Sequence, residues 1–594
     1  MIDEVKNDLK SFLIESGFHG DFKFETPPRI ELGDLCLNVF KLFDENGVKG
    51  SLILADKIVN LISNLKDESN PLVMKFGVDE RIKIIDKVNT VGPYVNFYFN
   101  DIELVKNLLK SFTKDFGKLK MGKGKKIMVE YGCPNPLKVF HLGHLKNLIT
   151  GESVARIFEN AGYKVIRVNY QGDVGMHVAK ALWGINQLNA EFKKIKTKPL
   201  LERINFLGRA YAHGAKAFEE NEVSKAEILD YNEKVYSQDK SIQVIYKMTR
   251  KWSLDYFDLI YKKLDTKYNQ MYFESEVFER GIKIVEQFVK KGVFVKSEGA
   301  IIFPGSKYGL HDRVFINSKG LPTYEAKELA LAEKRYKKYH PAGIIHVVGK
   351  EQTEYFKVLF KALEQVIPES KGKSQHLIGG YLQLKGGKKM SSRTGQVVAG
   401  DELLNMTESE IVELMKDRKI KNKAEVVRRI TGAVLKYSML KSNVSQDVAF
   451  DMEESVSFTG DSGPYLLYIM ARIKSILRKS LPHRQAGKIP ASSAGRQNSK
   501  SKIVVVQPEE KKLLLQITQF ADVTKLAVEK LDPSQIAKYL FELAQKFNSF
   551  YENCSVLKAE SEVIRDFRLQ LINMTGQVME KGLDLLGIKA VDEM

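Results

Sequence analysis

The chain contains little cysteine and no long apolar segment. Its three cysteines, Cys36, Cys133 and Cys554, lie far apart and form no C-x-x-C pair, so the sequence predicts neither a disulfide framework nor a zinc site and favours a reducing compartment. No apolar run approaches the roughly 20 residues that a transmembrane helix needs. The first residues, MIDEVKNDLKSFL, include early acidic side chains and are typical of an amphipathic helix rather than a signal peptide. We therefore expect a cytoplasmic protein without a membrane span.

The composition is that of a large globular protein. The 594 residues are 43% hydrophobic and 28% charged, which excludes a disordered chain, a coiled coil and collagen. The length predicts several packed cores. Lysine and arginine total 93 against 74 aspartates and glutamates, a formal net charge of +19. This excess suits a polyanionic partner such as nucleic acid, although a solvated lysine-rich surface would also explain it.

A strand–helix–strand unit is predicted in the second hundred residues. Residues 127–131 and 164–170 are typical of short strands, and between them apolar residues recur at helical spacing from Leu145 onward. Such a βαβ unit belongs to a parallel nucleotide-binding sheet. Strand-like runs at 343–348 and 376–378 resume the pattern. The sequence therefore predicts an α/β fold with a Rossmann-type parallel sheet.

The patterns divide the chain into three predicted domains. Residues 1–118 mix helical and strand-like segments and form an expected α+β N-terminal domain. Residues 119–404 form the Rossmann-type domain, with a helical and mixed insertion at about 185–310, and residues 405–594 have the periodicity of an all-α C-terminal domain. The Ser-, Gly- and Lys-rich stretch 484–502 is expected to be a mobile loop between two helices.

The motif His141-Leu142-Gly143-His144 lies between the first predicted strand and the following helix. A helix N-terminus presents free N–H groups and about half a positive charge, so it attracts phosphate. Gly143 would let a nucleotide approach the backbone closely. The two imidazoles could donate hydrogen bonds to charge that develops on phosphorus. Two histidines that merely cap a helix would give the same pattern.

A second motif, residues 388–395 (KKMSSRTG), combines lysines with small hydroxyl residues and glycine. Such a loop can close over a triphosphate. Taken alone, it is better interpreted as a solvated basic loop. Its position downstream of the H-x-G-H motif changes that interpretation, because the two motifs now have to be explained together.

Together, the two motifs resemble the HIGH and KMSKS signatures of class I aminoacyl-tRNA synthetases. Residues 129–144 (VEYGCPNPLKVFHLGH) are similar to the arginyl-tRNA synthetase pattern VE-[FY]-S-S-P-N-x-x-K-P-[FM]-H-x-G-H, and residues 169–175 (NYQGDVG) to its N-x-x-G-D-W-G. Residues 390–395 resemble its M-S-T-R-x-G, and residues 461–472 (DSGPYLLYIMAR) its D-T-G-P-Y-L-Q-Y-x-x-A-R helix. The resemblance extends over the whole chain.

This resemblance implies an arginine–tRNA ligase. Arginine would be activated by ATP to arginyl-adenylate, with tRNA(Arg) already bound, and then transferred to the 3′-terminal adenosine of that tRNA. ATP would carry Mg²⁺, no structural metal is expected, and the enzyme would be a monomer. The residues implied in catalysis are His141, His144, Lys138 and Lys389. Those implied in ATP binding are His141, Gly143, His144, Lys389, Met390, Ser391 and Ser392.

The resemblance also implies an arginine pocket. Its members are Glu130, Asn135, Tyr324, Glu328 and Gln352. Glu130 aligns with the family's guanidinium-binding glutamate. The second carboxylate, normally an aspartate, is here Glu328, and i,i+4 spacing places it on the same helical face as Tyr324. A carboxylate pair matches the planar N–H donors of a guanidinium.

Recognition of tRNA is implied at both ends of the chain. The aligned residues are Asn38, Asn96, Tyr465, Tyr468, Arg472 and Met594. The N-terminal domain would contact the tRNA core, and the C-terminal helices would hold anticodon bases against aromatic side chains. Tyr465 and Tyr468 could equally be core residues at helical spacing.

Two other functions are considered. Another class I synthetase, for cysteine, glutamate or lysine, is disfavoured for cysteine by the lack of a zinc set and for glutamate by the acidic residues in the pocket. A non-catalytic tRNA-binding homologue is disfavoured by the intact histidines and Lys389. Gly132 and Cys133 replace the family's Ser-Ser pair and Tyr355 replaces a histidine, so the sequence leaves the detailed pocket geometry open.

Overall fold

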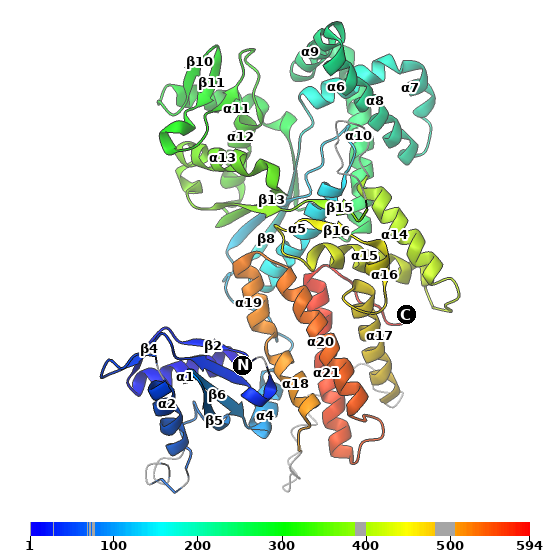
Figure 1. Cartoon of the computed structure of the whole chain (residues 1–594). Coiled ribbons are helices and arrows are strands. Elements are labelled where there is room, and N and C mark those ends of the chain that lie inside the picture. Colours follow the sequence, from blue (N-terminus) through cyan, green and yellow to red (C-terminus); the bar gives the residue numbers. More distant parts are fainter. Residues whose placement is uncertain are drawn as a thin grey trace. The chain divides into compact units, whose positions relative to one another are not determined.

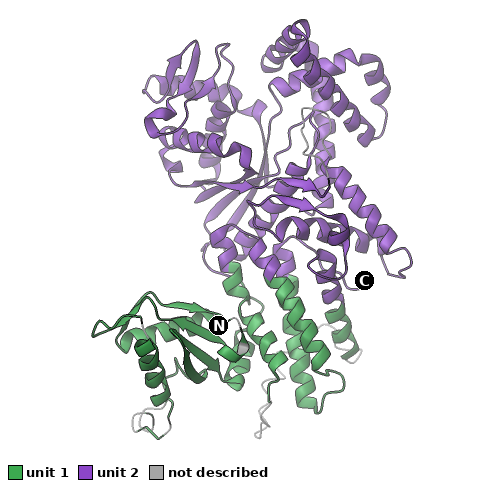
Figure 2. Cartoon of the chain, viewed as in Figure 1, with its two compact units in different colours: residues 1–118, 472–524, 539–580 green, residues 119–471, 525–538, 581–594 purple. Residues whose placement is uncertain are grey.

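The computed structural model (Figure 1) describes residues 2–594 apart from 28, 51, 68, 71, 72, 74–77, 387–398 and 481–504. The chain forms two compact units (Figure 2), residues 1–118, 472–524 and 539–580 in one and residues 119–471, 525–538 and 581–594 in the other. Residues 405–471 thus cluster with the unit that contains the Rossmann-type sheet, and the division into three domains stays a prediction. The predicted loop at 484–502 lies outside the described residues.

Five parallel strands form the central sheet of the second unit. Their order is β14-β13-β7-β8-β9, with bounds β7 (Lys126–Tyr131), β8 (Lys164–Gln171), β9 (Gln270–Phe273), β13 (Gly343–Gly349) and β14 (Ser374–Gly379). The predicted strands and the Rossmann-type sheet are confirmed. The chain runs outward from β7 to β9 and then returns to β13 on the other side of β7. The strand order therefore reverses between β7 and β13, and in such sheets ligands bind beyond the carboxyl ends of the strands at the reversal.

Helix α5 (Leu142–Asn160) connects β7 to β8 and packs on β7, β8 and β13. Just beyond it, Gly162 has a φ of +85°, the left-handed conformation that ends many helices. Side chains along a strand alternate between the two faces of its sheet. Tyr131 therefore points toward α5, whereas Glu130 points to the opposite face.

The opposite face is covered by α11 (Phe278–Val289), α12 (Tyr324–Tyr339) and α13 (Thr353–Val366). Their buried apolar side chains form one core with Met128, Val168 and Ile344 of the sheet. A three-stranded antiparallel sheet, β10 (Val295–Ser297), β11 (Ala300–Phe303) and β12 (Arg313–Ile316), adds Phe303 and Phe315 to that core. The central strands are thus buried on both faces, as parallel sheets require.

Helices fill most of the connection from β8 to β9. They are α6 (Met176–Gln187), α7 (Asn189–Ile195), α8 (Leu200–Glu220), α9 (Glu222–Tyr236) and α10 (Lys240–Lys263). After β14, β15 (Leu382–Leu384) pairs in parallel with β16 (Val448–Phe450). The remaining helices of this stretch are α14 (Gly400–Leu414), α15 (Lys423–Leu440) and α16 (Met452–Val456).

The first unit begins with an α+β region, as the sequence predicts. Its elements are α1 (Ile2–Glu15), β1 (Phe18–Gly20), β2 (Lys23–Glu25), β3 (Leu35–Asn38), β4 (Leu42–Asp44), α2 (Leu52–Asn64), β5 (Ile85–Val91), β6 (Tyr94–Phe99) and α4 (Asp101–Ser111). The four-stranded antiparallel sheet has the order β2-β3-β6-β5.

The C-terminal part of the chain is helical, which confirms the predicted all-α region. Its helices are α17 (Gly463–Ser480), α18 (Pro508–Thr518), α19 (Phe520–Lys530), α20 (Ser534–Asn553) and α21 (Glu562–Leu585). No helix in the described ranges combines the length and apolarity needed to cross a bilayer.

Candidate active site

His141 and His144 cap the N-terminus of α5 reciprocally. The Nδ1 atom of His141 accepts the backbone N–H of His144 (3.4 Å), and the Nδ1 atom of His144 accepts that of His141 (3.2 Å). The two rings are stacked, with centroids 3.6 Å apart. Because each Nδ1 atom is an acceptor, the proton of each neutral ring lies on Nε2. The motif therefore both caps the helix and presents two Nε2–H donors beside its positive end.

Both imidazoles are neutral at neutral pH. Burial, followed by the nearby charge of Lys138, lowers the pKa of His141 to about 4. Burial lowers the pKa of His144 well below its usual value. Neutral imidazoles can donate hydrogen bonds to a phosphate but add no net charge of their own, so positive charge at this site must come from elsewhere.

Lys138 supplies such a charge just before the motif. Its ammonium lies 5.3 Å from the centroid of the Tyr211 ring and forms no ion pair within the part of the chain that the structure describes. Burial, and then the nearby charge of Lys180, lowers the pKa of Lys138. A half-buried cation without an anionic partner is unfavourable, and a bound phosphate would supply that partner.

The described residues that follow the second motif contact the first motif. Lys389, Met390, Ser391 and Ser392 lie in the segment 387–398, outside the described residues. Immediately after that segment, Ala399 forms an antiparallel bridge with His141, and the N–H of Gly400 donates to the carbonyl of Phe140 (2.7 Å). Ala399 and Gly400 therefore lie against the H-x-G-H turn.

Glu130 is buried at the end of β7 and is already engaged by side chains of the protein. One carboxylate oxygen accepts from Arg335 of α12, and the other lies 2.8 Å from Nδ1 of His346 in β13. These two partners keep the pKa of Glu130 below its usual value although burial opposes this. A carboxylate offers about four acceptor positions, so these contacts do not exhaust Glu130.

Two further carboxylates beyond the carboxyl ends of the strands also have cationic partners. Asp173, after β8, accepts from Nε of Arg250 (2.8 Å). Glu274, after β9, accepts from Nζ of Lys327 (2.5 Å), and both members of this pair are almost completely buried. These ion pairs join the loops of the sheet edge to α10 and α12.

Glu328 is the exception among these carboxylates. It is 7% exposed, yet its carboxylate makes no hydrogen bond or ion pair with any described residue. Burial, and then the negative charge of Glu130, raises the pKa of Glu328 to about 8. With Glu328 ionised, Glu130, Glu328 and Arg335 together carry one uncompensated negative charge. The geometry therefore suits a ligand cation at Glu328.

The other predicted arginine-binding residues differ in accessibility and in hydrogen bonding. Asn135 accepts the N–H of Gly172 through Oδ1 (2.9 Å), and its amide nitrogen makes no hydrogen bond with described residues. Tyr324 begins α12 and is 49% exposed, and Gln352 is exposed at the end of a short helix, η4 (Lys350–Gln352), after β13. Tyr355 stands where the family has a histidine. Burial, and then the negative charges of Glu328 and other carboxylates nearby, raises the pKa of its hydroxyl.

Sequence reasoning missed Arg335, His346, Glu274 and Lys327. Of the two partners of Glu130, only Arg335 had a local signal, its helical spacing from Glu328. Arg335 follows Glu328 by seven residues, two helical turns along the same face, and His346 stands directly opposite Glu130 in the pairing of β13 with β7. No sequence pattern, however, joins Glu274 to Lys327.

A stability contrast follows from these pairings. Glu130→Gln leaves Arg335 buried without its charge partner, and breaking a buried pair in this way costs about 3–5 kcal/mol. Glu328→Gln removes a carboxyl that has no cationic partner in the part of the chain that the structure describes, so we expect little or no loss of stability at pH 7. The midpoints of urea denaturation of the two variants measure this contrast. Equal midpoints would contradict the assigned pairings.

The predicted tRNA-binding residues differ in accessibility. Asn38 is half-buried and accepts the N–H of Phe40 (3.0 Å), whereas Asn96 is only 3% exposed in β6 and is not available to tRNA in this conformation. Tyr468 is 38% exposed and Tyr465 is half-buried, so neither is a fully buried core residue. Arg472 donates to Oδ1 of Asn548 (3.2 Å). Met594 is half-buried at the end of the chain.

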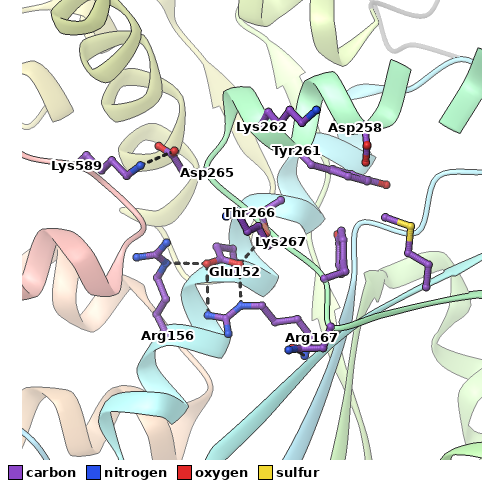
Figure 3. A pocket seen from close by; sticks show the side chains of 13 residues that line it. Glu152, Arg156, Arg167, Asp258, Tyr261, Lys262, Asp265, Thr266, Lys267 and Lys589 are labelled. Carbon is purple, nitrogen blue, oxygen red and sulfur yellow. Dashed lines mark hydrogen bonds and ion pairs between the residues drawn. The ribbon is translucent and has the colours of Figure 1, made fainter. Parts of the chain in front are cut away.

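A pocket of about 860 Å³ lies beside α5, away from these residues (Figure 3). Glu152 of α5 is bound there by Nε of Arg156 (2.8 Å), Nε of Arg167 (3.0 Å) and the hydroxyl of Tyr131 (2.7 Å). None of the predicted site residues lines it. Its charged groups pair largely with one another, and through Tyr131 they support β7 from the face opposite to Glu130. Across the described ranges, no group of three or more His, Cys, Asp or Glu side chains is placed to hold a metal ion.

Comparison with known proteins matches the chain nearly from end to end. Residues 104–452 match the family described as tRNA synthetases class I (R), catalytic domain, and residues 466–594 the family described as DALR anticodon binding domain. The arginine–tRNA ligase of Clostridium perfringens is 30% identical over 577 residues, covering 96% of this chain and 95% of that protein. That of Treponema denticola is 30% identical over 586 residues, covering 96% and 94%.

Solved structures share the fold. The structure of Thermus thermophilus arginyl-tRNA synthetase is 23% identical and gives a TM-score of 0.75, covering 100% of this chain and 99% of that chain. The structure of the arginyl-tRNA synthetase from Plasmodium falciparum is 18% identical, with a TM-score of 0.74 and the same coverage.

Proposed function

Because this chain belongs to the arginyl-tRNA synthetase family of class I aminoacyl-tRNA synthetases, we propose that it activates L-arginine with ATP and transfers the arginyl group to tRNA(Arg). The observation that carries the assignment of the substrate is Glu328, a buried carboxylate that none of the described residues binds. The helix N-terminus with its two Nε2–H donors supports the nucleotide half of the reaction. The compartment and oligomeric state, cytoplasmic and monomeric, stay predictions.

The guanidinium of arginine would bind Glu328 and complete the charge balance of the acidic site. A guanidinium presents planar, paired N–H donors that match a carboxylate in a bidentate manner. Glu130, held by Arg335 and His346, would add acceptor capacity from β7. Lysine would leave part of this hydrogen-bonding capacity unmatched, and a site built on such bonds can reject an analogue by about 10⁴-fold.

At the other end of the substrate, the α-carboxylate would reach the phosphate site. Asn135, with its free amide nitrogen, Tyr324 and Gln352 would orient the polar end. A carboxylate oxygen of arginine then attacks the α-phosphorus of ATP, and the bond to the β-phosphate oxygen breaks to release pyrophosphate. Holding the two reactants in line supplies much of the rate.

Negative charge that develops on the phosphates would be met by His141, His144 and Lys138. The imidazoles donate from Nε2, and Gly143 lets the nucleotide approach the helix end. Mg²⁺ carried by the ATP phosphates would further neutralise the departing pyrophosphate. Lys389, Met390, Ser391 and Ser392 are proposed to contact ATP from the second motif. The terminal ribose hydroxyl of tRNA then attacks the adenylate carbonyl, and AMP leaves.

The C-terminal helices would bind the anticodon, and the N-terminal region the tRNA core. Tyr465, Tyr468, Arg472 and Met594 are the candidates on the anticodon side, and Asn38 is the accessible candidate near the N-terminus. Activation of arginine is proposed to require bound tRNA. Because such contacts neutralise phosphates, the affinity for tRNA should fall as salt rises.

Arginine binding should depend on pH through Glu328. Its raised pKa, about 8, means that the free site holds a proton at pH 7, and the cationic guanidinium must displace it. We expect release of nearly one proton per arginine bound at pH 7, and a KM for arginine that falls by about tenfold per pH unit up to about pH 8. Calorimetry at pH 7 in buffers of different ionisation enthalpy measures the proton directly.

The variant Glu328→Gln is the control for this linkage, because it removes the titrating carboxyl and leaves Glu274, which also has a raised pKa. The pH dependence of arginine binding should disappear in the variant. An unchanged proton release would assign the proton to another group.

The overall assignment is tested by ATP–pyrophosphate exchange with each amino acid, with and without tRNA. Of the amino acids tested, only arginine should support exchange, and it should do so only when tRNA is present. Exchange with a different amino acid would identify another class I synthetase. Binding of tRNA without exchange for any amino acid would identify a non-catalytic homologue.

A further inference from the structure

Lys146 is a buried lysine in the second turn of α5, just beyond the H-x-G-H motif. It is 1% exposed, and no carboxylate among the described residues is bonded to its ammonium. Instead Nζ donates to the carbonyls of Gly380 (2.9 Å), Gln446 (2.8 Å) and Val444 (3.4 Å). An ammonium has three N–H donors and no acceptor, so three converging carbonyls satisfy it completely.

These carbonyls belong to the base of the β15–β16 pair. Gly380 lies between β14 and β15, and Val444 and Gln446 lie on the loop that leads into β16. The two segments are also joined by the N–H of Gly380, which donates to the carbonyl of Val444 (2.9 Å), and the N–H of Val448, which donates to the carbonyl of Tyr381 (2.8 Å).

The contact is too close to allow a side chain at position 380. A Cβ atom on Gly380 would lie 2.1 Å from the carbonyl oxygen of Gln446. Asp447 makes a second set of contacts between these segments. Its Oδ1 accepts hydrogen bonds from the N–H of Tyr381 (2.8 Å) and from the ammonium of Lys350 (2.9 Å), which follows β13. Lys146 thus sits at the centre of a tight junction between α5, β13, β15 and β16.

This junction fixes the described stretch that precedes the second motif, while the stretch that follows it is fixed to the first motif. β15 ends at Leu384, and the described chain resumes at Ala399, which is bridged to His141. Lys146 and His141 both belong to the start of α5. One helix end therefore holds both described flanks of residues 387–398.

We infer that Lys146 is a positioning residue for adenylate formation: by binding the carbonyls of Gly380 and Gln446, it sets β15 against the helix that carries His141 and His144. This rests on the proposed function. Lys146 touches no substrate. Its effect arises because misplacement of reacting groups by about 1 Å can cost about 10²-fold in rate, and because such groups depend on the shell of contacts behind them.

The test is arginine-dependent, tRNA-supported ATP–pyrophosphate exchange by Lys146→Met. We expect kcat to fall by about 10²-fold and the KM for ATP to rise. The KM for arginine should stay unchanged, because Glu328 and Glu130 lie on the face of the sheet opposite α5. A merely structural lysine would not separate the two KM values.

Lys436→Met is the matched control. Lys436 is likewise buried, 4% exposed, and its ammonium donates to a carbonyl, that of Gly587 (2.5 Å), away from β15 and the H-x-G-H motif. It should lose a similar amount of stability but keep its kcat. Lys146→Gln, which retains one amide donor, provides a folded second variant if Lys146→Met is unstable, and should give an intermediate kcat.

Three results would overturn the inference. The first is an unchanged kcat and KM for ATP in Lys146→Met or Lys146→Gln. The second is a loss of kcat in Lys436→Met as large as that in Lys146→Met. The third is an equal rise of the KM for ATP and the KM for arginine in Lys146→Met. If the unmodified protein shows no exchange with arginine and tRNA, the proposed function fails instead, so the two failures are distinguishable.

Discussion

Replacing Glu328 by glutamine should raise the KM for arginine by about 100-fold or more and leave the KM for ATP nearly unchanged. Removing one partner of a buried charge pair costs about 2–5 kcal/mol, and each 1.4 kcal/mol is a factor of ten. The guanidinium would lose a buried carboxylate that has no cationic partner within the described ranges. Steady-state aminoacylation with each substrate varied in turn measures both KM values.

Glu325→Gln is the matched control for this experiment. Glu325 precedes Glu328 on α12, is similarly buried at 6% exposed, and accepts from Nη1 of Arg313 (2.7 Å). Because Arg313 already occupies it, its loss should leave the KM for arginine unchanged. Glu328→Asp, which restores the family's usual side chain, should recover much of the affinity. Similar KM values for arginine in Glu325→Gln and Glu328→Gln would contradict the role of Glu328.

Replacing His141 or His144 by alanine should lower kcat for adenylate formation by about 10²–10³-fold, with a smaller effect on the KM for ATP. This is the size of effect seen when one preorganised donor to developing charge is removed. The two donors act on the same phosphate charge, so the double variant should lose less than the product of the single losses. Single-turnover formation of arginyl-adenylate measures the step directly.

Loss of helix capping must be separated from loss of the donor. His141→Asn keeps an N-cap acceptor, which is a favourable residue at that position, but withdraws the Nε2–H group. It should unfold at the same urea concentration as the unmodified protein and still lose activity. Because the pKa of His141 is about 4, the kcat should show no step near pH 6.5 that depends on His141. Full activity in His141→Asn would show that His141 only caps the helix and does not act in catalysis.

The sheet and the nucleotide end of the site could be predicted because their signals are local. The apolar run at 127–131, the helical spacing from Leu145 and Gly162 lie within one βαβ unit, and each agrees with its neighbours. The pairing of His141 with His144 is also local, since the N-cap and the third residue of the helix lie within four residues. Local patterns thus predicted the βαβ unit and the position of the two histidines at the start of its helix, whereas the strand order is seen only in the structure.

The electrostatic arrangement of the arginine pocket could not be predicted in the same way. Glu130 and Arg335 are 205 residues apart, and Glu274 and Lys327 are 53 residues apart. Which acid finds a partner depends on how α12 lies against β7 and β9, a tertiary property that no periodicity encodes. The sequence therefore indicated two equivalent carboxylates, whereas the structure distinguishes a paired one, Glu130, from an unpaired one, Glu328.

Helical periodicity alone does not determine which compact unit a helix joins. Helical periodicity predicted one domain over 405–594, and within that range residues 405–471 cluster with the unit of the parallel sheet. The reason is visible in Lys146, whose bonds join α5 to the loop before β16. A helical pattern indicates which face of a segment is apolar, but it does not indicate which element packs against that face.

The most direct test of the account is a crystal structure with a non-hydrolysable analogue of arginyl-adenylate. The guanidinium should lie within hydrogen-bonding distance of Glu328, with Arg335 still on Glu130. The phosphate oxygens should face the Nε2 atoms of His141 and His144. A guanidinium bound elsewhere, or a phosphate remote from both imidazoles, would contradict the proposed site.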